Sequence, residues 1–377
     1  MRRPKPLLIL VFSIFMFMGM SLCVYAGQDQ AEEDYSGIEA IIGEMTKSGE
    51  ISFSDIVSQL LNGNLDSSFK TLLNYISQKI FSELKLNRSI MVQIIGIAVI
   101  GAVFTNFSAA FAKKYVAETG FYLTYMIVFA LLAASFLSAS GIAGEVVGHL
   151  IDLMKAIVPA FCLALTFSSG MTTSGAFYEI MMIAVVCVDW LMAGFIMNFI
   201  RIYVVLSLVN SMTKEDYLSK MAELLYIVIS WVLKTILAVT LGLNLIQGMV
   251  LPAFDSIKNG LLSKLTTVIP GIGNAFGMAA KAAIGSGVLL KNAVGTAGVI
   301  VICVVCAVPL LKLLVIVLMY KLVEAVIQPV SDERLIQCVH ITGEGILLLF
   351  KTAGTVILLF VLSLAMITSS SNMMLSV

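Results

Sequence analysis

Long apolar runs dominate the chain, and short polar breaks separate them. A helix that crosses a bilayer needs about 20 predominantly apolar residues, and six stretches reach that length. They are residues 90–112, 120–140, 176–200, 222–250, about 293–318 and 346–368. Residues 313–320 belong either to the tail of the fifth stretch, kinked at Pro309, or to a short seventh one. The pattern predicts an all-α, polytopic membrane helix bundle of six or seven spans over residues 89–377.

Two other apolar stretches are too short or too interrupted to span a membrane. Residues 156–167 stop at a polar, glycine-bounded segment over 168–175, and residues 261–269 stop at Pro270. Backbone released from a helix at membrane depth survives only where it is buried in protein or lines a wet cavity. We therefore expect two re-entrant or broken helices, which in transporters often carry the substrate site.

The first 26 residues have the three parts of a secretory signal peptide. Basic residues precede an apolar run over 7–22, and Ala26 ends a segment suited to cleavage. An uncleaved anchor helix is the alternative. Both interpretations export the residues that follow.

Residues 27–88 form an exported acidic segment with short amphipathic helices. Apolar residues recur there at helical spacing, for example at Ile38, Ile41 and Ile42. Ser52 precedes one such helix as an N-cap, with Asp55 in its first turn. A segment of this length cannot build a hydrophobic core alone. We therefore expect its apolar stripes to dock on the membrane domain, on each other or on a partner.

Composition excludes a water-soluble fold. Hydrophobic residues make up 59% of the 377 residues and charged residues 12%, against about 45–50% and about 25% in soluble domains. The mean hydropathy is +1.01. Lysine plus arginine equals aspartate plus glutamate at 23 each, so no net field attracts nucleic acid.

The placement of basic residues orients the first half of the membrane domain. Lys113 and Lys114 follow the first span and Arg201 ends the third, which puts these positions on the cytoplasmic side. Lysines between residues 258 and 291 fall on the opposite side by the same count. The side of the C-terminus therefore stays open.

The two halves of the membrane domain resemble each other weakly. A shift of 111 residues places Pro159 on Pro270 and the span from Phe121 on the span from Val232. This indicates an internal duplication, parallel if residues 156–168 only dip into the membrane and inverted if they cross it. Chance similarity between apolar helices is the alternative.

Asp189 is the most isolated charge in an apolar stretch. A carboxylate at the bilayer centre costs about 2.5–3.5 kcal/mol on insertion scales, so it faces a cavity or a partner. Lys234, in the fourth predicted span, is the first candidate partner. A static interhelical pair or a protonated, hydrogen-bonded carboxyl are the alternatives to a proton relay.

Hydroxyl side chains gather at the first helix break. Such a cluster can coordinate an ion or a small polar solute, and the same residues also permit close helix packing. Together with the second break and the charged candidates, the possible pore or solute contacts are Ser168, Ser169, Gly170, Thr172, Thr173, Ser174, Asp189, Lys234, Pro270 and Asn274.

No pattern of catalytic or cofactor-binding residues stands out. Cys303 and Cys306 form a C-x-x-C inside an apolar helix, without a strand–helix context for thiol chemistry. The two histidines, His149 and His340, have neither triad nor metal spacing. A phosphate-binding loop and a dinucleotide fingerprint are absent from the sequence. We expect no cofactor, no metal and no enzymatic activity.

The sequence motifs resemble those of the stage III sporulation protein AE family of endospore-forming bacteria. The resemblance covers roughly residues 90–370 and includes the order and spacing of the motifs. They are Val158-Pro159, Ser168-Ser169-Gly170, Ser174-Gly175-Ala176-Phe177, Ile269-Pro270, Leu289-Leu290-Lys291-Asn292-Ala293-Val294-Gly295, Pro309-Leu310-Leu311-Lys312, Tyr320-Lys321-Leu322 and Gln328-Pro329. After Pro329 the chain departs from the glycine-rich link expected of the family, which leaves the role of that loop open.

The resemblance implies a membrane subunit of the trans-envelope channel, a secretion-like complex, that joins mother cell and forespore. Its implied partners are other stage III sporulation A-operon proteins, including a secretion-type ATPase and ring-forming proteins, and the stage II sporulation protein Q side of the channel. The implied location is the mother-cell-derived membrane around the forespore, with the exported segment in the intermembrane space. The residues also allow an autonomous ion-coupled secondary transporter or a purely structural anchor.

Overall fold

The computed structural model describes most of the membrane domain and two short helices before it. The described residues are 35–46, 52–61, 92–93, 95–96, 99–100, 114–169, 171–212, 217–266, 273–329 and 331–370. The expected signal peptide, much of the exported segment and most of the first expected span lie outside this set.

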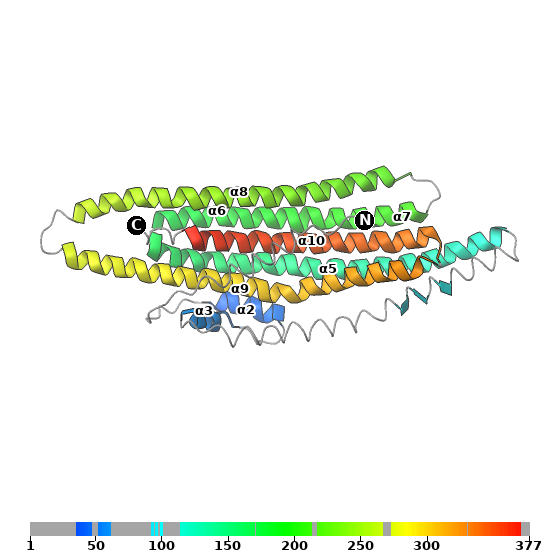
Figure 1. Ribbon diagram of the computed structural model, residues 1–377, viewed down its shortest axis with the longest axis horizontal. Coiled ribbons are helices and arrows are strands. Elements are labelled where there is room, and N and C mark those ends of the chain that lie inside the picture. Colours follow the sequence, from blue (N-terminus) through cyan, green and yellow to red (C-terminus); the bar gives the residue numbers. More distant parts are fainter. Residues whose placement is uncertain are drawn as a thin grey trace.

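The membrane domain consists of long antiparallel helical rods that lie side by side (Figure 1). The first is α5, Lys114–Ser169, whose 56 residues reach about 84 Å at 1.5 Å per residue. The second returns through α6, Met171–Asp189, the π-helix η1, Trp190–Ile196, and α7, Met197–Met212. The remaining rods are α8, Ser219–Thr266, α9, Gly273–Ile327, and α10, Glu333–Ser370.

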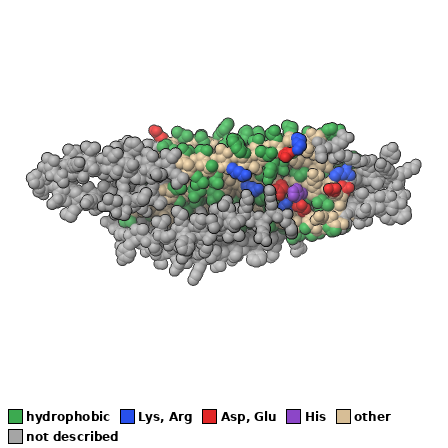
Figure 2. All heavy atoms as spheres, turned by 45° about the horizontal axis from the view of Figure 1, so that its top comes forward, with side chains coloured by type: hydrophobic (Ala, Val, Ile, Leu, Met, Phe, Trp, Pro, Cys, Tyr) green, Lys and Arg blue, Asp and Glu red, His purple; other side chains and the backbone are tan. Residues whose placement is uncertain are grey.

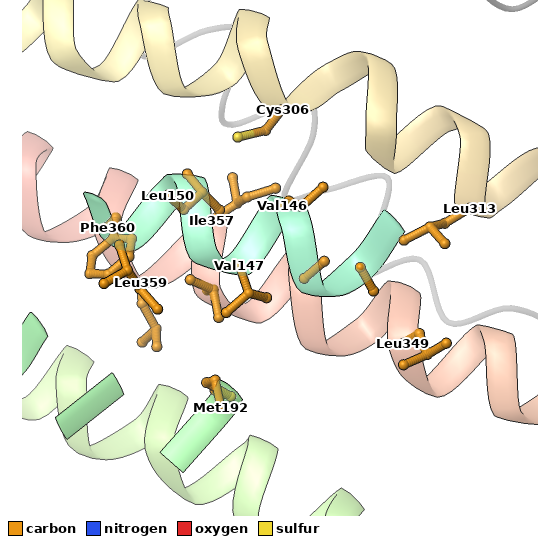
Figure 3. Close-up of a cluster of buried hydrophobic side chains, with 14 of the residues drawn as sticks. Val146, Val147, Leu150, Met192, Cys306, Leu313, Leu349, Ile357, Leu359 and Phe360 are labelled. Atoms are coloured by element: carbon orange, nitrogen blue, oxygen red, sulfur yellow. The ribbon is translucent and has the colours of Figure 1, made fainter. Parts of the chain in front are cut away.

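Helix α10 lies at the centre of the bundle. It contacts α5, α7, α8 and α9, and its side chains are buried around its circumference, as at Leu348, Leu349 and Phe360. In Figure 3, Val146 and Leu150 of α5 and Met192 of η1 belong to the same apolar cluster as residues of α10. The interior of the bundle is therefore filled with hydrophobic side chains.

Two glycines set how closely the rods approach α5. A Cβ at Gly345 of α10 would collide with Val204 of α7 and lie 3.2 Å from Phe136 of α5. A Cβ at Gly295 of α9 would collide with Thr368 of α10 and lie 3.0 Å from Phe161 of α5. These contacts fix the register of the rods at two levels along the bundle.

The helices α2, Ser36–Thr46, and α3, Phe53–Leu61, pack against the membrane domain. Helix α2 contacts α5 and α3 contacts α9, and both lie along α9 in Figure 1. The expected cap at the start of α3 is present, because the Asp55 backbone N–H donates to Ser52 Oγ at 3.2 Å. Of the docking alternatives, the structure shows two: the apolar stripes bury Ile42 and Val57 against the bundle, and the two helices also contact each other.

Among the described residues, five helical segments are long and apolar enough to cross a membrane. They are Tyr122–Thr166, Phe177–Ser211, Ser219–Leu243, Gly285–Ile327 and Glu333–Met366. This confirms the helix-bundle prediction. Residues 313–320 continue α9 through Pro309, so they do not begin a separate span.

Helices end where the sequence predicts breaks, but the pieces are joined differently. Residues 156–167 complete α5 instead of forming a short segment of their own, because the helix continues through Pro159. Pro159 therefore lies inside a helix, whereas Pro270, which the 111-residue shift aligns with it, lies outside the described residues. Helices α5 and α8 run in the same direction (Figure 1), which is the sense of a parallel duplication.

Candidate functional site

The first helix break is the corner between α5 and α6. Helix α5 ends at Ser169 and α6 begins at Met171, which places Thr172 and Thr173 in the first turn of α6. Gly170 lies outside the described residues, as do the side chains of Ser168, Ser169, Thr172 and Thr173. Whether those hydroxyls contact a solute stays a prediction.

Ser174 makes a hydrogen bond to the backbone of α5. Its side chain is buried, and its Oγ donates to the Cys162 carbonyl oxygen at 2.5 Å. The Thr166 hydroxyl donates to the same carbonyl at 2.8 Å. This arrangement ties the first turns of α6 to the last turns of α5, and contact of Ser174 with a solute stays a prediction.

Asp189 pairs with Lys155 of α5, which is not the partner predicted from the sequence. Asp189 Oδ2 lies 3.8 Å from Lys155 Nζ of α5, and Lys155 also lies 3.3 Å from Asp152 Oδ1. The expectation that Lys234 is the first partner is therefore wrong, because α6 packs against α5 and Lys234 is an exposed residue of α8. The three side chains of this group are between 41% and 59% exposed.

The π-helix η1 follows Asp189 directly and changes the direction in which later residues point. Asp189 and Arg201 are twelve residues apart, which in a continuous α-helix would set them about 120° apart. A π-helix forms i→i+5 hydrogen bonds, so each residue rotates the chain about the helix axis by less than it does in an α-helix. As a result both residues reach α5, Asp189 at Lys155 and Arg201 at Ser140, whose Oγ accepts from Arg201 Nε at 2.9 Å.

Asn198 extends the polar contacts of this rod. Its Nδ2 donates to the Gly194 carbonyl oxygen of η1 at 2.7 Å, and its Oδ1 accepts from Arg201 Nη1 at 3.4 Å. The side-chain amide thus satisfies a carbonyl in the irregular part of the rod. Short π-helical segments often occur at functional sites.

A second group of charges joins α9 to α10. Lys321 Nζ lies 3.1 Å from Glu344 and 3.4 Å from Glu324, while His340 Nδ1 lies 2.9 Å from Glu324. On the face drawn in Figure 2, acidic and basic side chains gather around a histidine within a largely hydrophobic surface. Ion pairs with this geometry hold the two helices together near the turn that connects them.

The second break contributes little to a described site. Asn274 is the second residue of α9, and its side chain lies outside the described residues, as does Pro270 altogether. Among the residues that the structure describes, no group of three or more His, Cys, Asp and Glu side chains is placed to hold a metal ion. The charged contacts between α5 and the α6–η1–α7 rod are therefore the main candidate site.

Asp152, Lys155 and the π-helix are not among the features predicted from the sequence. The first two lie between the predicted span 120–140 and the apolar stretch 156–167, where no element is predicted. The signal was present, because titratable residues recur every three or four positions over 145–155. Nothing in the apolar periodicity of residues 190–196 indicates a π-helix.

Comparisons with known proteins agree with the architecture. The profile of the family described as stage III sporulation protein AE matches residues 51–371. The stage III sporulation protein AE of Bacillus subtilis (strain 168) is 25% identical over 316 residues, which cover 84% of this chain and 79% of that protein. No solved structure matches the chain. The chain therefore belongs to the stage III sporulation protein AE family, and its role lies in sporulation.

Proposed function

We propose that the chain is a non-enzymatic, permease-like or export-platform subunit of the channel between mother cell and forespore. The single observation that carries this proposal is the family match over residues 51–371, which includes all five long apolar helices. A bundle of apolar helices that a few ion pairs and hydrogen bonds join, as at Arg201–Ser140 and Lys321–Glu344, suits a transport assembly whose energy source is a separate chain.

The proposed partners are the other stage III sporulation A-operon proteins, with the ATPase as motor, and stage II sporulation protein Q across the intermembrane space. Helices α2 and α3 leave Glu44 and Asp55 exposed while their apolar faces are buried. Such an acidic outer surface is available to a basic partner surface in that space. The proposed location is the mother-cell-derived membrane around the forespore.

The test is deletion of the gene in its host, followed by measurement of late forespore gene expression and of channel assembly. The proposal expects both to fail and both to return with the intact gene. Normal assembly and normal expression without the protein would refute it. Solute uptake by the purified protein alone in liposomes would instead favour an autonomous transporter.

A further inference from the structure

The outer face of α5 carries charges at a depth where α9 and α10 carry few. Two close-packed levels bracket these charges along the bundle, one at Phe136, Gly345 and Val204, the other at Phe161 and Gly295. They are 25 residues apart on α5, or about 38 Å at 1.5 Å per residue. That length matches a hydrocarbon core of about 30 Å together with part of its headgroup regions.

Between these levels the rods differ in charge. Helix α9 carries only Lys312 among residues 295–320, and α10 carries only Lys351 among residues 345–368. Helix α5 carries four titratable residues over 136–161, and they are Glu145, His149, Asp152 and Lys155. The rod of α6, η1 and α7 carries Glu179, Asp189 and Arg201 over residues 177–204. The charges at this depth therefore concentrate on α5 and on the rod that packs against it.

The four titratable residues of α5 belong to one continuous polar stripe. Their spacing of three or four places them on one side of the helix, and small residues or proline fill the positions between them. The α5 stripe consists of Ser138, Gly141, Glu145, Gly148, His149, Asp152, Lys155, Ala156 and Pro159, all exposed or half-buried. The buried Val146, Val147 and Leu150 point from the opposite side into the bundle core (Figure 3).

The backbone adds a polar group to the stripe. Pro159 has no N–H to donate to the carbonyl of Lys155 one turn earlier. A carbonyl without its helical partner at membrane depth needs another donor. The carbonyl and the charged Lys155 side chain therefore both favour a hydrated environment at this position.

We infer that the α5 stripe, with Asp189 beside it, lines a water-filled passage along the outside of this bundle. Lipid is a costly neighbour for four titratable side chains at this depth. A dry protein partner is also unfavourable, because Asp152 and Asp189 share the one cation Lys155 among the described ion pairs, and a carboxylate left unpaired in a dry contact is destabilising. Water solvates these side chains, and hydrated ions and small polar solutes are the chemical class that such a wall accommodates.

The passage runs beside this bundle and not through it, because the interior around α10 is filled. Another subunit must then close the far wall. This inference rests on the proposed function. It identifies the α5 stripe as the surface that would line the channel, because a channel subunit presents a polar wall to the passage that it helps to form.

Cysteine accessibility tests the inference. A Cβ at Gly141 or at Gly148 meets no atom within 4 Å, so Gly141→Cys and Gly148→Cys fit without removing a charge. Val239→Cys is the matched control, because Val239 is an exposed apolar residue of α8. Val239 lies 13 residues from Tyr226, whose ring is 5.8 Å from that of Tyr203, and this places Val239 at about the depth of Gly148.

The variants are made in a protein whose native cysteines are replaced and which still supports forespore gene expression. If that protein is inactive, the variants are made in the protein that keeps its native cysteines, and the labelling of that parent protein is subtracted. Membranes from sporulating host cells, opened on both sides, are treated with a charged, membrane-impermeant thiosulfonate. The thiolate is the reactive form of cysteine, and apolar surroundings suppress its formation. We therefore expect the cysteines at positions 141 and 148 to react at least about tenfold faster than Val239→Cys.

Two outcomes would overturn the inference. If the glycine positions react only with a lipid-soluble maleimide, as the control does, the stripe faces lipid. If they react with neither reagent, it is a dry protein contact. Labelling reports the surroundings of the stripe whatever the phenotype of a deletion, so the failure of this inference is distinguishable from the failure of the proposed function.

Discussion

Arg201 of α7 and Asp189 at the end of α6 contact the same helix, α5, although an uninterrupted α-helix would turn them away from each other. The seven residues of η1 between them produce this relationship. Arg201 binds Ser140 and Asp189 pairs with Lys155, so the rod is tied to α5 at two depths. The π-helix therefore allows both polar contacts between the two rods. Its own apolar side chains Met192 and Ile196 remain buried.

Asp189→Asn should impair function more than stability. The pair with Lys155 is long and about half exposed, and such pairs contribute under about 1 kcal/mol. We expect near-normal amounts of protein in the membrane but reduced late forespore gene expression, and partial recovery in the Lys155→Asp, Asp189→Lys double variant. A forespore reporter and an immunoblot of membranes measure the two effects.

Glu223→Gln is the control for that experiment. Glu223 pairs with Lys220 at 2.9 Å on α8, where Lys220 is 90% exposed, so the same loss of a carboxylate there should leave the reporter unchanged. Normal reporter activity in Asp189→Asn would show that the Asp189 charge has no part in the function.

The excess of carboxylates along the α5 stripe should make the labelling rate depend on the charge of the reagent. Carboxylates outnumber ammonium groups around Gly148, and a site lined by one sign of charge raises the local concentration of the opposite sign by about tenfold or more. We therefore expect a cationic thiosulfonate to modify Gly148→Cys faster than an anionic one of similar size. Adding Asp152→Asn should reduce that ratio, and raised salt should reduce it further. Equal rates for the two reagents would exclude an acidic passage.

The pattern of apolar residues predicts the rods well, because apolar runs of this length leave no alternative to membrane helices. It does not predict how the runs join. Residues 120–140 and 156–167 appear as separate units in the sequence, since charges at 145–155 interrupt the hydropathy between them. In the folded chain those charges occupy one side of α5 while Val146 and Leu150 continue its buried side, so the helix is uninterrupted.

The candidate site was only partly predictable for a related reason. Asp189 stands out because it is alone in an apolar stretch, whereas Lys155 is one of several charges near a predicted break. Which lysine reaches Asp189 depends on the packing of α6 against α5, and hydropathy carries no information about that choice. The α-helical period fails across η1, so the common direction of Asp189 and Arg201 is visible only in three dimensions.

Gly345→Ala should destabilise the bundle. The added Cβ collides with Val204 and approaches Phe136, both of which are buried, and overpacking of this kind costs about 1–3 kcal/mol. Thermal unfolding of the purified protein in detergent measures the effect. Gly354→Ala on the same helix is the matched control, since its Cβ meets nothing within 4 Å. Alanine exceeds glycine in helix propensity by about 1 kcal/mol, so the control should be neutral or stabilising. Equal stability of the two variants would contradict the close packing of α10 against α5 and α7.

Ser174→Ala separates a packing role from a solute-binding role at the first helix break. The Ser174 hydroxyl is buried and donates to the Cys162 carbonyl oxygen, and a hydrogen bond of this type contributes about 1 kcal/mol. We expect a loss of stability of that size, with normal forespore gene expression wherever the protein still accumulates in the membrane. Ser138→Ala on the exposed side of α5 is the control, and its stability should change by less than about 0.5 kcal/mol. If Ser174→Ala keeps full stability but loses forespore gene expression, the hydroxyl contacts the transported solute, and the break is a binding site instead of a corner held by hydrogen bonds.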